Sequence, residues 1–244
     1  MATSPVTLVP AAPAAPGAHS IGELRERSLH AELKRWYAQP GDRAEVRLEG
    51  FVIDLVRGDT LIEIQTRGFA KLARKLTRLV RDHQVRLVFP IARRKWIVTS
   101  DADGTVLRRR ASPKRGAYHD LYAELIRIPH LVGHANFTLE VLLVEVEELR
   151  CADGLGSWRR RGISIRDTRL LEVCDRRRFD TAADFARLLP PHLEQPFTNR
   201  TLAAAGAMPA TLAGMMTYTL RRIGAIELVG RRNRAHLFAR TPRT

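Results

Sequence analysis

Two short apolar stretches, each with an acidic residue near its middle, constrain this chain more than any other feature of its sequence. Residues 49–66 read EGFVIDLVRGDTLIEIQT, with Asp54 in the first stretch and Glu63 in the second. The Gly58-Asp59 pair between them is a turn signal, so the two stretches are expected to form an antiparallel hairpin. Burying a carboxylate without a partner costs free energy, so both acids need an explanation.

A divalent cation between the two carboxylates is one explanation. A hairpin that turns at residues 57–60 places Asp54 opposite Glu63, with Cβ atoms on the order of 5 Å apart, and two carboxylates that close repel each other. Mg²⁺ binds a couple of carboxylates together with waters and phosphate oxygens. We therefore expect a Mg²⁺ or Mn²⁺ site formed by Asp54, Glu63 and the carbonyl of Ile64.

The alternative is that the two acids are solvated residues on an exposed face of the sheet. Three nearby arginines would then neutralise them as cross-strand ion pairs, namely Arg47, Arg57 and Arg67.

The charge of the chain indicates what such a site acts on. The 244 residues include 41 Lys+Arg against 26 Asp+Glu, which gives a formal net charge of +15. This excess favours a polyanionic partner, with nucleic acid ahead of an acidic membrane. The sequence contains no apolar run long enough to span a bilayer, and we expect a cytoplasmic, nucleoid-associated protein. Two cysteines, Cys151 and Cys174, are too few for a disulfide framework or a zinc site.

Composition and periodicity divide the chain into three parts. Residues 1–19 are rich in Ala and Pro and predict a disordered leader. Residues 20–178 alternate helix and strand patterns and predict an α/β core with a mixed sheet. The core elements are expected at residues 20–37, 44–48, 51–56, 60–66, 69–80, 85–91, 95–99, 117–128, 138–146 and 166–172, with polar loops at 101–116 and 154–161. The pattern gives no role for residues 101–175.

Residues 179–244 form a third pattern of three short helices and a hairpin. The helices are expected at 183–189, 198–205 and 210–223, and the hairpin strands at 226–229 and 236–239 around the basic tip GRRNR. Three helices followed by such a hairpin describe a small winged-helix (α+β) domain. Its outward-facing candidates for DNA contact are Thr211, Thr217, Tyr218, Arg221, Arg222, Arg231, Arg232 and Arg234. The alternative use of such a domain is dimerisation or docking.

The order of acidic residues resembles the PD-(D/E)XK nuclease superfamily, whose restriction-endonuclease-like fold also occurs in Holliday-junction resolvases. The resemblance covers roughly residues 20–100 and rests on Glu32 in HAELK, Asp54 in FVIDLV, and Glu63 with Gln65 in LIEIQT. It implies that Asp54 and Glu63 bind the metal and that Glu32 contributes directly or through water. It also implies a homodimer, because members of the superfamily often act as dimers.

Gln65 departs from the pattern, because the superfamily usually has a lysine there that orients the attacking water. The neighbouring helices offer three candidates to supply the missing positive charge, namely Lys34, Lys71 and Lys75. The basic residues Lys71, Arg74, Lys75 and Arg78 recur along residues 69–80 and are candidates, with Lys34, to bind a DNA backbone. A solvated basic helix face is the alternative.

These observations predict a divalent-metal-dependent endodeoxyribonuclease that hydrolyses phosphodiester bonds in DNA repair or recombination, with double-stranded or branched DNA as substrate. Its catalytic candidates are Glu32, Asp54, Glu63 and Gln65. The alternative is a non-catalytic DNA-binding protein, a regulator or repair accessory, that keeps a degenerate nuclease scaffold. An RNA-directed nuclease is a third possibility, because charge does not distinguish the two polymers.

Overall fold

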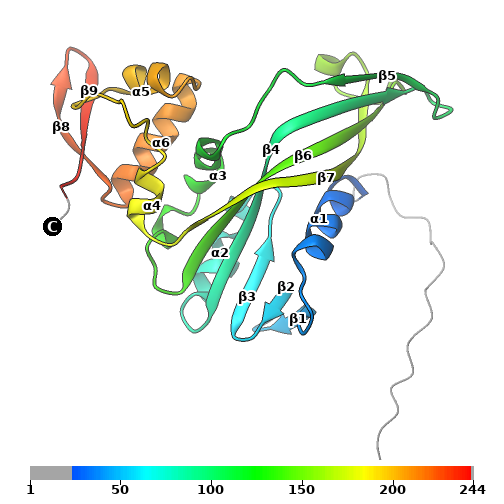
Figure 1. Cartoon of the computed structure of the whole chain (residues 1–244), viewed down its shortest axis with the longest axis horizontal. Coiled ribbons are helices and arrows are strands. Elements are labelled where there is room, and N and C mark those ends of the chain that lie inside the picture. Colours follow the sequence, from blue (N-terminus) through cyan, green and yellow to red (C-terminus); the bar gives the residue numbers. More distant parts are fainter. Residues whose placement is uncertain (1–23, 243–244) are drawn as a thin grey trace, which may run out of the picture.

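The computed structural model describes residues 24–242. Within them, seven strands form one mixed sheet with helices on both faces, and a smaller unit of helices and a hairpin follows (Figure 1). The predicted α/β class with a mixed, helix-flanked sheet is confirmed. The leader predicted at residues 1–19 and the start of the first predicted helix lie outside the described residues.

The sheet has the strand order β1-β2-β3-β4-β6-β7, and β5 pairs with the outer part of β4. Strands β3, β4 and β6 run parallel to one another, and the other neighbours are antiparallel. The antiparallel β1-β2-β3 meander is therefore as predicted. The strands are β1 (Arg43–Leu48), β2 (Phe51–Arg57), β3 (Thr60–Ile64), β4 (Gln84–Ser100), β5 (Val106–Ala111), β6 (Phe137–Cys151) and β7 (Ser164–Phe179).

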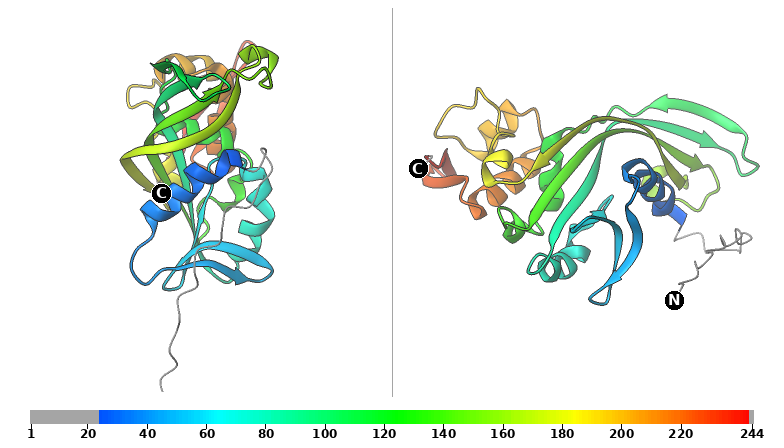
Figure 2. Two further views of the ribbon diagram at one scale, coloured as in Figure 1. Left: turned by 90° about the vertical axis from the view of Figure 1, so that its right-hand side faces the viewer. Right: turned by 60° about the horizontal axis from the view of Figure 1, so that its bottom comes forward.

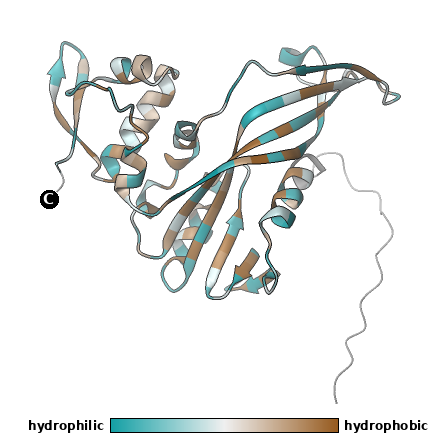
Figure 3. Ribbon diagram, viewed as in Figure 1, coloured by the Kyte–Doolittle hydropathy of each residue, from teal (hydrophilic) through white to brown (hydrophobic). Residues whose placement is uncertain are grey.

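Two helices cover opposite faces of this sheet, and β3 shows the division. On one face α1 (Leu24–Tyr37) packs Leu33 in the same hydrophobic cluster as Ile62 and Ile64. On the other, α2 (Phe69–Leu79) packs Leu76 in a cluster with Leu61. Because side chains alternate along a strand, Glu63 points to the α2 face with Leu61. Figure 3 shows the hydrophobic residues that line the middle of β4 and β6.

The outer half of the sheet is longer than predicted. Strand β4 continues through the basic residues 93–95, with a register shift between Ala92 and Arg94, where the sequence predicts two separate strands. The loop predicted at 101–116 contains β5, and β7 extends to Phe179. Their many arginines hide these strands from hydrophobic periodicity, because both faces are largely exposed there. Figure 2 shows β4, β6 and β7 curving over α1.

The helix predicted at residues 117–128 is only partly formed. A 3₁₀ turn (Tyr118–Leu121) leads into the one-turn helix α3 (Tyr122–Leu125), and a second 3₁₀ turn (Pro129–Leu131) follows. Leu121, Tyr122 and Leu125 are nevertheless fully buried against the α2 side of the sheet. Burial of these three side chains therefore holds the segment in place without a regular helix.

The C-terminal unit has the predicted order of three helices and a hairpin, and an antiparallel bridge between Phe197 and Phe238 ties the hairpin to the segment before α5. One continuous hydrophobic cluster joins this unit to the sheet, because Tyr122 and Leu125 share it with Phe185, Met216 and Leu220. The elements are α4 (Ala182–Ala186), α5 (Asn199–Ala205), α6 (Ala210–Arg222), β8 (Ile226–Arg232) and β9 (Ala235–Arg240).

A buried hydrogen bond across this junction gives a stability prediction. The hydroxyl of Tyr122, which is fully buried, donates to the Phe185 carbonyl at 2.8 Å. Tyr122→Phe removes this bond, while the carbonyl keeps the Leu188 N–H at 3.0 Å, and is expected to lower the free energy of unfolding by about 1 kcal/mol in urea denaturation. The half-exposed Tyr218 is the matched control, since Tyr218→Phe should change the free energy of unfolding by less than about 0.5 kcal/mol. Equal effects of the two substitutions would contradict this role.

Candidate active site

The β2–β3 hairpin opens where its two acidic residues meet. Its ladder pairs Arg57 with Thr60 and Leu55 with Ile62, which puts Asp54 and Glu63 opposite each other at the next position, as predicted. At this position the backbones of β2 and β3 no longer pair with each other, and the two acidic side chains bond to the backbone instead. Asp54 Oδ2 accepts the backbone N–H of Ile64 at 2.8 Å, and the backbone N–H of Asp54 bonds to Glu63. Each carboxylate therefore bonds to the backbone of the opposite strand at the open end of the hairpin, and the two are near enough for the charge of Asp54 to act to raise the pKa of Glu63.

Glu63 is buried against α2 and paired with Lys75. Its side chain is 5% exposed, and the Lys75 ammonium forms an ion pair with Oε1 while donating to the Val52 carbonyl at 2.5 Å. Among the described residues, Oε1 accepts no well-directed hydrogen bond, so the lysine leaves the carboxylate incompletely satisfied. Burial raises the pKa of Glu63 to about 7, although the bond and the charge of Lys75 act to lower it.

Asp54 meets two basic side chains of α1. His30 Nε2 lies 3.2 Å from Asp54 Oδ2, and Lys34 Nζ lies 3.7 Å from Oδ1. Burial acts to raise the pKa of Asp54, but the hydrogen bonds from His30 and from the Ile64 backbone outweigh it and lower the pKa. The hydrogen bond to Asp54 raises the pKa of His30 in turn. Asp54 therefore stays ionised in its cationic surroundings, whereas Glu63 takes up a proton near neutral pH.

His30 was missed by the sequence analysis, although a signal was present. His30 and Lys34 are four residues apart in HAELK, so they share one face of α1. That face is the one turned to Asp54.

Two other predicted site residues are engaged elsewhere. Glu32 lies two residues from His30, about 200° around the helix, and accepts the backbone N–H of Leu170 in β7 at 2.6 Å. The Gln65 side chain donates to the Arg67 carbonyl. The main chain of Ile64, whose carbonyl was the predicted ligand, stays at the site, because it bonds to Asp54 and to His30. The structure thus brings Asp54 and Glu63 together with Lys75, His30 and Lys34, and it does not bring Glu32 to them.

The solvated-face interpretation of the two acids is wrong. Glu63 is buried, and Asp54 is only 15% exposed at its side chain. Arg57, one of the arginines considered as a partner, instead pairs with Asp42, with Nη2 2.7 Å from Oδ2. The acids are therefore held inside the fold by basic residues of the two helices.

Of the three lysines considered as substitutes for the missing positive charge, Lys75 contacts Glu63, and Lys34 pairs with Glu45 and lies 3.7 Å from Asp54. Lys71 is exposed on α2. Lys75 comes from the helix that directly follows β3, and its side chain is 13% exposed. It therefore places a positive charge beside Glu63 that Gln65 cannot supply.

The donor set fits a magnesium or manganese ion held by few protein ligands. Within residues 24–242 no group of three or more His, Cys, Asp or Glu side chains is arranged to hold a metal. Mg²⁺, however, commonly takes only one or two carboxylates and fills its remaining positions with waters and phosphate oxygens. The adjacent carboxylates of Asp54 and Glu63, with Glu63 Oε1 lacking a directed hydrogen bond, meet that requirement.

The predicted DNA-contacting residues of α2 lie on its surface, with Lys71, Arg74 and Arg78 exposed. Arg78 is engaged with Glu49, at 2.8 Å between Nε and Oε2. Lys75 and Lys34, predicted in the same role, instead face the two acids. The basic face of α2 that is available to a polyanion is therefore smaller than predicted.

In the C-terminal unit, Thr211, Tyr218, Arg221 and Arg222 are exposed on α6, and Arg231, Arg232 and Arg234 are exposed on the hairpin. Thr217, predicted to face outward, is buried at 2% exposure and donates to Asn199 Oδ1 at 2.8 Å, so that prediction is wrong. A hollow of about 570 Å³ beside α6 and β9 is lined by Tyr218, Arg221, Arg222 and His236 among others.

A lone tryptophan is more often a packing residue, but Trp158 is 82% exposed. The Arg159 guanidinium lies 5.4 Å from the centre of its ring. Trp158 is therefore available for contact with a partner.

Comparison with known proteins places the chain in a family. Residues 27–180 match the family described as a domain of unknown function, DUF8091, and the chain belongs to it. The chain is similar to an uncharacterized protein of Treponema pallidum (strain Nichols), with 32% identity over 224 residues that cover 91% of this chain and 88% of that protein. No solved structure matches the chain. Within the described residues, no helix has the length and apolar character needed to cross a membrane.

The burial of Glu63 gives a pH-dependent stability prediction. The folded state holds the Glu63 proton more tightly than the unfolded chain, whose glutamate pKa is 4.5, so the free energy of unfolding falls as pH rises from about 4.5 to about 7. Glu63→Gln removes this penalty and should stabilise the protein at pH 8 by about 2 kcal/mol, or about 5 °C in melting temperature, but not at pH 4.

Thermal melts at the two pH values measure the effect. Glu227→Gln, at an exposed position, is the control and should show no pH-dependent gain. A variant Glu63→Gln that melts no higher than the unmodified protein at pH 8 would refute the assignment of a buried, destabilising carboxylate.

Proposed function

We propose that this protein is a divalent-metal-dependent endodeoxyribonuclease with a restriction-endonuclease-like core of the PD-(D/E)XK type. The observation that carries the proposal is the pair of adjacent carboxylates, Asp54 and Glu63, at the open end of a hairpin with Lys75 beside them. The raised pKa of Glu63 marks a cost of its burial, and a buried carboxylate with a shifted pKa beside a charged partner is typical of functional sites.

The roles of the residues follow from their positions. Asp54 and Glu63 would hold Mg²⁺ or Mn²⁺, which supplies an activated water and charge neutralisation at the scissile phosphate. Lys75, next to Glu63 and on a different element from Gln65, is the residue we assign to orient the attacking water. His30 and Lys34 keep Asp54 ionised and present positive charge to the phosphate.

The C-terminal unit supports DNA binding in the same proposal. Its order of helices, the hairpin and the Phe197–Phe238 bridge is compatible with a winged helix. Tyr218, Arg221 and Arg222 on α6 then contact the backbone or base edges, and the arginines of the β8–β9 turn contact a neighbouring segment of the duplex. Branched or double-stranded DNA in repair or recombination is the proposed substrate, and nucleoid association and a homodimer remain predictions.

The second candidate is a DNA-binding protein without turnover. One observation favours it: both carboxylates already have basic partners, so a metal has to compete with Lys75, Lys34 and His30. Cleavage assays distinguish the two candidates.

We expect Mg²⁺- or Mn²⁺-dependent cleavage of supercoiled or branched DNA, and its loss by at least about 10²-fold in Asp54→Asn and Glu63→Gln. Lys75→Met should cause a comparable loss of turnover, because it removes the charge beside Glu63 without removing a metal ligand. Lys71→Met, on the same helix but exposed and outside the site, is the matched control and should change binding more than turnover.

Manganese binding, followed by the electron paramagnetic resonance signal of free Mn²⁺, supplies a readout that does not need turnover. Binding should be lost in the Asp54→Asn, Glu63→Gln double variant and retained in Lys75→Met. DNA binding without cleavage in any metal would support the second candidate, and cleavage that survives both acidic substitutions would rule out this site.

The two exposed arginines of α6 give a prediction about DNA binding. Each phosphate contact that is lost lowers the dependence of log Kd on log salt by about one, so Arg221→Ala with Arg222→Ala should lower this slope by about two. Fluorescence anisotropy of a labelled duplex over a salt series measures it. Arg187→Ala with Arg176→Ala is a control of equal charge change on exposed positions outside α6 and the hairpin. An equal loss in both double variants would show that α6 has no special role.

A further inference from the structure

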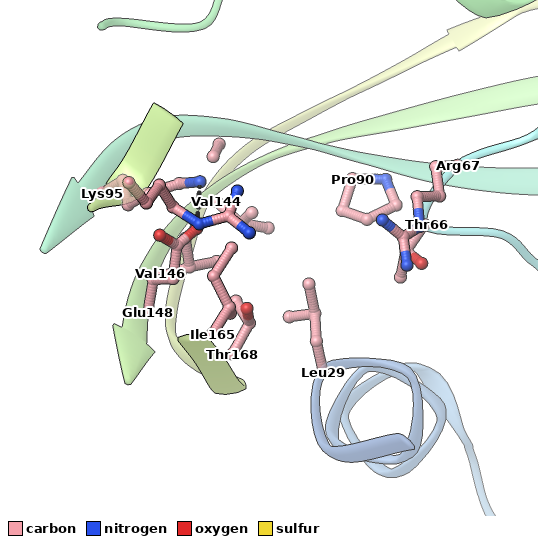
Figure 4. A pocket seen from close by; sticks show the side chains of 12 residues that line it. Leu29, Thr66, Arg67, Pro90, Lys95, Val144, Val146, Glu148, Ile165 and Thr168 are labelled. Atoms are coloured by element: carbon pink, nitrogen blue, oxygen red, sulfur yellow. Dashed lines mark hydrogen bonds and ion pairs between the residues drawn. The ribbon is translucent and has the colours of Figure 1, made fainter. Parts of the chain in front are cut away.

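A hollow beside the candidate active site lies on the α1 face of the sheet. It has a volume of about 480 Å³, within the range of roughly 300–1,000 Å³ that small-molecule sites occupy. Figure 4 shows Leu29 of α1 projecting into it, with Pro90, Thr66 and Arg67 at one end and Lys95 with Glu148 at the other. The curved strands β4, β6 and β7 form its wall.

The hollow adjoins the site at two points of the chain. Leu29 immediately precedes His30, which bonds to Asp54, and Thr66 immediately follows Gln65 at the end of β3. The hollow and the Asp54 contact thus share helix α1, so a strand of DNA that runs along α1 from a phosphate at Asp54 would pass this hollow with a neighbouring nucleotide.

The lining combines flat aliphatic walls with a charged pair. Pro90, Val144, Val146 and Leu29 supply apolar surface. At one end the Lys95 ammonium donates to Glu148 Oε2 at 2.7 Å, and Arg150 Nε donates to Glu148 Oε1 at 2.7 Å. Glu148 is buried with its side chain 7% exposed, and its bonds to Lys95 and Arg150 outweigh burial and lower its pKa. The hollow thus presents a fixed acceptor beside a donor at the end of an apolar slot.

We propose that this hollow binds one unstacked nucleobase of the DNA strand whose phosphate lies at Asp54 and Glu63; this inference rests on the proposed function. A base has two apolar faces and a polar edge of donors and acceptors, which matches aliphatic walls and a Lys95–Glu148 end. Basic Arg67 and Arg160 also line the hollow, and the chain carries a net charge of +15, which suits a polyanionic strand rather than a neutral ligand.

The proposal specifies the class of DNA. Taking a base out of a duplex stack costs a few kcal/mol, and the cost is smallest for a mismatched or single-stranded base. The protein should therefore prefer DNA with unpaired nucleotides next to the cleaved bond, such as flaps, bulges or branch points, over a continuous duplex. Trp158 stands two residues from Arg160 and is available to stack on a further exposed base.

The fluorescence of 2-aminopurine tests this without cleavage. Its emission rises when it leaves a base stack, and among residues 24–242 no aromatic side chain lines the hollow to quench it. In EDTA, flap oligonucleotides with 2-aminopurine at successive positions should show a several-fold rise on binding at one position only. Thr168→Trp fills the hollow from β7 and should abolish that rise. Ala92→Leu fills the hollow from β4 and should abolish the rise independently.

Val106→Trp is the control, because it adds the same ring at a position of β5 that is 60% exposed and outside the hollow. It should keep the rise. A rise that persists in both filled variants, or no rise at any position, would overturn the proposal. A rise in a protein that cleaves no DNA would reject the nuclease function alone, and cleavage without any rise would reject the base pocket alone.

Discussion

The exchange of backbone and side-chain hydrogen bonds at the open end of the β2–β3 hairpin is the interaction on which the rest of the site depends. The Ile64 N–H bonds to the Asp54 carboxylate, and the Asp54 N–H bonds to Glu63. Each carboxylate thereby satisfies a backbone group that the sheet would otherwise leave unpaired. The same exchange fixes the two acids side by side, so the geometry of the site is part of the geometry of the sheet.

The helices on the two faces balance the charge that this arrangement concentrates. Lys75 from α2 meets Glu63, while His30 and Lys34 from α1 meet Asp54. The balance is unequal, because burial outweighs the lysine and raises the pKa of Glu63 to about 7, whereas Asp54 stays ionised. A buried carboxylate with a raised pKa and a specific charged partner is a common feature of functional sites, and here each acid also completes the backbone hydrogen bonding of the sheet.

Helix α1 connects this site to the curved outer strands. Glu32 accepts the Leu170 N–H of β7 and so holds the helix under the arch of β4, β6 and β7. That contact sets the positions of His30 at Asp54 and of Leu29 in the neighbouring hollow. Glu32 therefore has a structural task that supports the site from the opposite side of the helix. The resemblance to nucleases assigned it a role in the metal site, directly or through water, which its hydrogen bond to β7 does not favour.

Local patterns in the sequence determined the mixed α/β class, the three-stranded meander and the opposition of Asp54 to Glu63, because turn residues and alternation act over a few positions. Hydrophobic periodicity did not reveal the long Arg-rich parts of β4, β5 and β7, whose pairing depends on neighbouring strands rather than on buried side chains. The partners of Asp54 and Glu63 were likewise decided by the tertiary structure. Which of three lysines meets Glu63, and that His30 rather than Glu32 meets Asp54, depends on how two helices rotate against the sheet. The spacing of His30 and Lys34 shows that they share a helix face, but it does not show which strand that face meets.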